Sequence, residues 1–156
     1  MRDIATLLDE YGASHVNRKN KIIHWICVPL IVWAVVALLW SLPFPTALQA
    51  GLILINWATV ALVAAQVYYL RLSFKLGLGL LLYNLLMILI VLLVASWSPW
   101  PLWQVALVVF IVAWIGQFIG HIYEGKRPSF FKDLQFLLIG PAWLMSFVYH
   151  KLRISL

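Results

Sequence analysis

A histidine, an amide and a carboxylate lie together at the end of a long apolar segment of this chain, in the sequence QFIGHIYE. Gln117 precedes His121 by four residues and Glu124 follows it by three, so a helix would place the three side chains on one face. Gly116 and Gly120 lie beside them and would let a second helix approach closely. Imidazole and carboxylate groups bind divalent metals, so this face is a candidate half of a metal site.

A second histidine block precedes the first apolar segment. His15 and His24 are nine residues apart and would point in opposite directions on one unbroken helix, at about 100° per residue. Asn17 and Asn20 lie between them, and asparagine favours a bend or a helix N-cap. We therefore predict that the chain bends here and that the fold brings His15 and His24 to His121, where they would hold iron, zinc or copper.

Other polar residues are assigned supporting roles. Glu124 could be a fourth metal ligand, an acceptor for an imidazole N–H or a solvated acid at the helix end, and we favour the second role. Gln117 needs a polar partner within the apolar layer, and Asn20 either caps the following helix or reaches the site. His150 has no comparable polar motif around it, so we interpret it as an interfacial residue.

Composition places these groups in a membrane protein. Of the 156 residues, 65% are hydrophobic and 10% are charged, whereas soluble domains are about 45–50% apolar. We predict one all-α membrane domain, a helical bundle that covers residues 1–156 and begins with an interfacial helix over residues 3–14.

Four apolar segments have the length of about 20 residues that a bilayer crossing requires. They cover residues 22–42, 46–70, 76–97 and 102–122. Within them, Asn56 and Asn84 are interpreted as partners in helix–helix hydrogen bonds. The tail, 128–156, is interrupted by Gly140 and Pro141. We predict a re-entrant or interfacial hairpin there, and a fifth crossing is the alternative.

The eleven Lys and Arg residues are distributed by loop. They lie before the first apolar segment, between the second and third, and after the fourth, and none lies in the Pro-rich loops 41–45 and 98–101. The positive-inside rule therefore predicts that both termini are cytoplasmic, in a bacterial inner or plasma membrane or in a eukaryotic endoplasmic reticulum. Because the cations form no continuous patch, we expect a lipid bilayer and no nucleic acid as partner.

The two histidine blocks resemble those of the membrane-bound, iron-dependent 2-hydroxy fatty acid dioxygenases. The resemblance covers the whole chain and is strongest in these two blocks. The matching residues are His15, Asn20 and His24 followed by Val28 and Pro29, and Trp114, Gln117, Gly120 and His121 followed by Glu124, Arg127, Pro128, Gly140 and Pro141.

This resemblance implies an enzyme of fatty acid α-oxidation that uses Fe2+. It implies that His15, His24 and His121 hold the iron, and that the substrates are a long-chain 2-hydroxy fatty acid and O2. The product would be a fatty acid one carbon shorter. Arg18, Arg71 and Arg127 are candidates for binding the substrate carboxylate, since a guanidinium group can do so in a bidentate manner.

Two other classes of protein stay open from the residues alone. One is a non-catalytic haem- or metal-binding membrane protein with His24 and His121 as axial ligands, which a Soret band would reveal. The other is a structural membrane bundle whose histidines are only interfacial, which the absence of bound iron, zinc and copper would favour. A channel is the least favoured class, because no segment carries a regular polar stripe.

Overall fold

The computed structural model describes residues 4–49, 54–125 and 130–154, and the side chains of the last range from residue 137 onward. These residues form seven α-helices and no strand, which confirms the predicted all-α class for the described part of the chain. The helices are α1 (Ile4–Gly12), α2 (Arg18–Ser41), α3 (Thr46–Gln49), α4 (Trp57–Leu72), α5 (Phe74–Trp97), α6 (Leu102–Glu124) and α7 (Phe130–Lys151).

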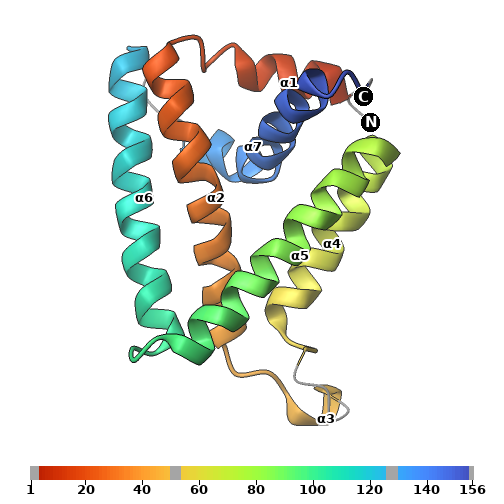
Figure 1. Ribbon diagram of the computed structural model, residues 1–156, viewed down its shortest axis with the longest axis vertical. Helices are drawn as coiled ribbons and strands as arrows, with labels where there is room; N and C mark the ends of the chain where they lie inside the picture. The colour runs from red at the N-terminus through yellow and green to blue at the C-terminus, as the bar shows by residue number, and fades with distance from the viewer. Residues whose placement is uncertain (1–3, 50–53, 126–129, 155–156) are drawn as a thin grey trace.

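Two pairs of antiparallel helices form the arms of a V (Figure 1). One arm is α2 beside α6, the other is α4 beside α5, and the arms meet through an apolar core that includes Trp33, Ala58 and Met87. In the open end of the V lie α1 and α7, which pack against each other through a second core that includes Leu7 and Ile139. The apolar faces of α1 and α7 are thus buried between the two arms.

Three helices of the described chain are long and apolar enough to cross a membrane, namely α2, α5 and α6. The predicted segment 46–70 is divided instead. α3 covers Thr46–Gln49, and α4 starts only at Trp57, because the Asn56 side chain caps it by accepting hydrogen bonds from the backbone N–H groups of Ala58 and Thr59. α4 has 16 residues, about 24 Å, so the structure supports three long spans, and a fourth crossing by α4 stays a prediction.

The predicted break at Gly140 and Pro141 is wrong. α7 continues through both residues as one helix, so the tail is a helical segment packed on the bundle and not a hairpin. A Cβ at position 140 would meet Val28 Cγ1 at 3.2 Å and Tyr11 Oη at 3.3 Å. The glycine therefore marks the place where α7 packs closely on α1 and α2.

The charged connections gather at one end of the molecule. The α1–α2 turn, the α4–α5 turn and the C-terminal ends of α6 and α7 lie at that end, and the α2–α3 and α5–α6 connections lie at the other (Figure 1). This grouping agrees with the distribution of Lys and Arg along the sequence. The assignment of the charged end to the cytoplasm stays a prediction.

Candidate metal centre

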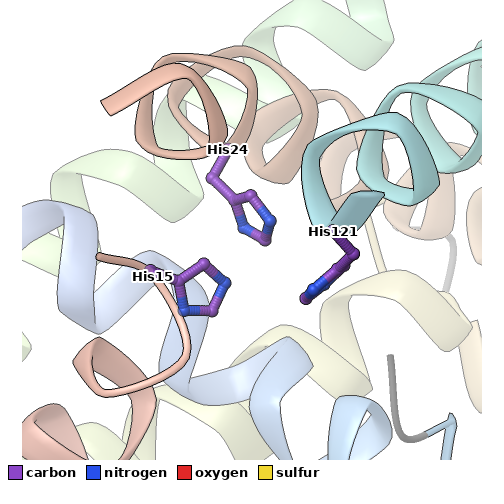
Figure 2. Close-up of side chains that lie close together, drawn as sticks. All are labelled: His15, His24 and His121. Atoms are coloured by element: carbon purple, nitrogen blue, oxygen red, sulfur yellow. The ribbon is translucent and has the colours of Figure 1, made fainter. Parts of the chain in front are cut away.

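Three histidines from three elements converge at the charged end of the molecule (Figure 2). His15 comes from the turn after α1, His24 from α2 and His121 from the last turn of α6. One ligand-capable atom of each lies within 4.8 Å of the other two. Nitrogens about 2.1 Å from one ion lie at most about 4.2 Å apart, so small side-chain rotations would bring the three imidazoles onto a single ion.

The bend between His15 and His24 lies where the sequence predicts it. α1 ends at Gly12, and Asn17 caps α2 by accepting a hydrogen bond from the backbone N–H of Lys19 at 2.9 Å. The bend places the imidazole centroids of His15 and His24 4.1 Å apart.

The Nδ1 atom of His15 donates a hydrogen bond to the Tyr11 carbonyl oxygen at 2.6 Å. This bond fixes the tautomer of His15 and leaves its Nε2 atom with a free lone pair. Burial lowers the pKa of His15 below the usual 6.5, and this effect outweighs the opposite effect of the carbonyl contact. His15 is therefore neutral at pH 7, which is the form that binds a metal.

His15 and His24 both have a buried Nε2 atom with no hydrogen-bond partner. The other nitrogen of His24, Nδ1, lies 3.4 Å from the Tyr11 hydroxyl. A buried polar atom without a partner is unfavourable by about 1–3 kcal/mol. A divalent cation among the three rings would satisfy both Nε2 atoms, so the donor set fits a metal ion.

Close packing of α2 on α6 brings His24 and His121 together, and the two glycines make it possible. A Cβ at Gly116 would lie 2.6 Å from Cys27 Sγ, and a Cβ at Gly120 would lie 2.5 Å from Asn20 Oδ1. Neither position has room for a Cβ atom unless the facing side chain of α2 moves. The close helix approach expected from Gly116 and Gly120 is thus present in the structure.

Glu124 connects the end of α6 to the turn that carries His15. Its carboxylate accepts hydrogen bonds from the backbone N–H groups of Val16 at 2.9 Å and Asn17 at 3.0 Å, and from Asn20 Nδ2 at 2.9 Å. These contacts are to backbone and amide groups, and the contact to an imidazole that we favoured from the sequence stays a prediction. Glu124 therefore connects the end of α6 to residues 16–20, and Asn20, which is fully buried, belongs to the same connection.

Gln117 lies at the wall of the space between the histidines. It is 8% exposed, and its Oε1 atom is buried without a hydrogen-bond partner. The space is a cavity of about 50 Å3. Its lining consists of Tyr11, His15, His24, Val28, Ile31, Trp114, Gln117, His121 and Leu137.

The two candidate arginines among the described residues are not brought to this cavity. Arg18 and Arg71 are exposed, and neither lines it. Arg127 lies outside the described residues. His150 is exposed on α7 and is not a member of the three-histidine group.

Two aromatic residues of the site were missed from the sequence. The Tyr11 ring stacks on His15 with centroids 4.2 Å apart, and the Trp143 ring lies 5.3 Å from the same imidazole. Tyr11 occupies the apolar face of α1, where helical spacing marks it as a core residue, and Trp143 comes from α7. Only the folded structure shows that both rings shield His15 from water.

The described residues are all-α, with three long apolar helices and a group of three histidines of which two are buried, and they define a membrane-type protein with a candidate metal centre. The chain belongs to the Mpo1-like family, because the family model described as "2-hydroxy-palmitic acid dioxygenase Mpo1-like" matches residues 1–152. It is similar to the 2-hydroxy-palmitic acid dioxygenase MPO1 of Saccharomyces cerevisiae, with 28% identity over 145 residues, 92% of this chain and 78% of the yeast protein. No solved structure matches the chain. The family recognised from the two histidine blocks is thus confirmed.

Proposed function

We propose that this protein is an Fe2+-dependent dioxygenase that shortens long-chain 2-hydroxy fatty acids by one carbon, with His15, His24 and His121 as the metal ligands. The observation that carries the proposal is the pair of buried, unpartnered Nε2 atoms of His15 and His24 beside His121. Family membership supports the substrate class, since the family and its yeast member are named for 2-hydroxy-palmitic acid.

The overall reaction balances without a further reductant. A 2-hydroxy acid and O2 give the acid one carbon shorter, CO2 and water, because oxidation of the hydroxylated carbon to a carboxyl group and of the original carboxyl carbon to CO2 together provide all the electrons that O2 takes up. A bound ferrous ion would supply open coordination positions and redox chemistry for this reaction.

The residues of this chain orient and shield the reacting groups. Three neutral imidazoles would leave the charge of a divalent ion uncompensated, and the hydroxyl and carboxylate groups of the substrate can match that charge. Gln117 Oε1 has no partner, so we assign it as an acceptor for the substrate hydroxyl. Arg18 and Arg71 are exposed, so in this proposal neither contacts the carboxylate. Tyr11 and Trp143 keep water from His15.

The small volume of the cavity at the histidines argues against the alternative of a haem protein. A cavity of about 50 Å3 next to the three rings has no room for a porphyrin. The free nitrogens of His15 and His24 are better matched to a single small ion.

The test is metal analysis and oxygen consumption for single His→Ala variants purified without oxygen. We expect iron and turnover of 2-hydroxyhexadecanoic acid in the unchanged protein, and loss of both in His15→Ala, His24→Ala and His121→Ala. His150→Ala is the matched control and should keep both, since His150 is exposed and outside the group. Retention of iron by all four variants would refute the ligand assignment. Bound iron with no oxygen uptake on any 2-hydroxy acid would refute the reaction.

A further inference from the structure

A second cavity, of about 110 Å3, lies between the two arms of the V. Its walls come from α2, α4, α5 and α7 and consist mainly of aliphatic side chains, including Val35, Leu39, Leu62 and Ala65. The volume is several times that needed by one water molecule, about 10–15 Å3. The packing therefore leaves apolar space in the centre of the bundle.

The second cavity adjoins the metal centre. Leu137 of α7 lines both cavities, and its side chain packs in the cluster of Ile31. On α2, His24 and Ile31 line the first cavity, and Val35 and Leu39 line the second. These α2 positions follow helical spacing and share one face. One stripe of α2 thus runs from the imidazoles into the apolar cavity, over about 22 Å from His24 to Leu39.

The lining of the second cavity is suited to an alkyl chain and not to water. The Tyr69 hydroxyl donates to the Leu138 carbonyl oxygen at 2.8 Å, and Asn84 Nδ2 donates to Gln66 Oε1 at 3.1 Å. The Tyr83 hydroxyl is buried without a partner. A buried water molecule makes about 2–4 hydrogen bonds to polar groups, and the mainly aliphatic lining of this cavity offers few such groups.

We propose that this apolar cavity binds the alkyl chain of the 2-hydroxy acid whose carboxyl end lies at the three histidines, and that Ala65 sets the chain length that fits. The inference rests on the proposed function. The alkyl chain of the substrate follows the stripe of α2 and passes Leu137. Ala61 and Leu138 line the cavity and are exposed, so the end of a long chain continues toward lipid.

The decisive comparison is Ala65→Phe against Ala64→Phe. Ala65 lines the cavity, whereas its neighbour Ala64 is exposed and does not. The measured quantity is the ratio of kcat/KM for 2-hydroxyhexadecanoic acid to that for 2-hydroxyoctanoic acid. A loss of iron lowers kcat/KM for both substrates alike and therefore cancels in this ratio. The different partitioning of the two acids into detergent cancels when the ratio is compared with that of the unchanged protein.

Ala65→Phe should lower this ratio by roughly 60-fold, because each CH2 kept out of apolar surroundings lowers affinity about fourfold and the ring displaces about three of them. Ala65→Leu should lower the ratio less. This variant should keep the iron content and the elution volume of the unchanged protein, so that its lower ratio cannot be attributed to misfolding by overpacking. Ala64→Phe should leave the ratio unchanged.

Binding to the iron-free protein provides a second readout, through displacement of a fluorescent fatty acid by the same two acids. An Ala65→Phe variant that keeps its iron and the original ratio would overturn the inference, and so would an equal fall in Ala64→Phe. Co-purification of a phospholipid that Ala65→Phe expels, with an unchanged ratio, would assign the cavity to lipid and also overturn it. If the unchanged protein oxidises neither acid but binds them with dependence on Ala65, the proposed reaction fails and the chain-binding cavity stands.

Discussion

Replacement of Glu124 by alanine tests whether the connection between α6 and the His15 turn positions the metal ligands. The change removes three hydrogen bonds with a charged acceptor, from Val16 N, Asn17 N and Asn20 Nδ2. None of the three donors belongs to an imidazole. A loss of metal affinity would therefore arise from altered ligand positions and not from removal of a ligand.

The expected size follows from these contacts. Hydrogen bonds to charged groups contribute about 1.5–3 kcal/mol each, but Glu124 is half-buried and water can replace part of each bond. With about 1 kcal/mol per bond, the loss is about 3 kcal/mol of stability. Loss of such outer contacts typically weakens metal binding by about 10–100-fold. We expect a reduction in that range for Glu124→Ala.

The assay is an anaerobic titration with Fe2+ against a competing chelator, together with thermal unfolding. Glu124→Gln is the graded variant. Its oxygen can accept from Val16 N, and its amide can donate to Asn20 Oδ1, which is buried without a partner, so its loss should be smaller. Glu10→Ala removes an exposed acid of α1 and serves as control. A metal affinity of Glu124→Ala equal to that of Glu10→Ala would refute the reasoning.

Four further outcomes are expected. Gly120→Ala should destabilise the protein by about 1–3 kcal/mol and reduce its iron content, because the new Cβ meets Asn20 Oδ1. Thermal unfolding and metal analysis measure these two effects, and values equal to those of the unchanged protein would contradict the close packing at Gly120. Asn56→Ala should lower stability by about 1 kcal/mol through loss of the α4 cap, without change in iron content. Removal of metal by a chelator should lower the unfolding temperature of the unchanged protein but not that of His24→Ala, since a ligand bound to the native state alone at 100 times its Kd adds about 2.7 kcal/mol. With an impermeant thiol reagent on intact cells, Ser98→Cys should react and Lys75→Cys should not, and the reverse pattern would overturn the predicted orientation.

Much of the fold and the site follows from local sequence patterns. Apolar segments of sufficient length predict the long helices, and the nine-residue separation of His15 and His24 predicts a bend because an unbroken helix cannot bring them together. The interhelical role of Asn84 is confirmed by its hydrogen bond to Gln66. These features depend on residues that are close in sequence or on the simple geometry of a helix.

The errors arose where packing decided between local alternatives. The role of Asn56 as the cap of α4 was not predicted, and it arises because the turn before Trp57 places Asn56 at a helix start. Gly140 and Pro141 stay helical because the close contact with Val28 and Tyr11 holds α7 in place. The partners of Glu124 were not predictable for the same reason, since they lie more than 100 residues away.

The hydrogen bond from Val16 to Glu124 joins positions 108 residues apart, and the histidine ligands are divided in the same way. A ribosome adds about 5–20 residues per second, so the third histidine is made about 5–20 s after the first two. Until α6 is synthesised, the nascent chain carries only two of the three imidazoles. In the proposed iron enzyme, metal loading would therefore be a late step of biogenesis, and a chain that stalls before α6 would lack the third proposed ligand.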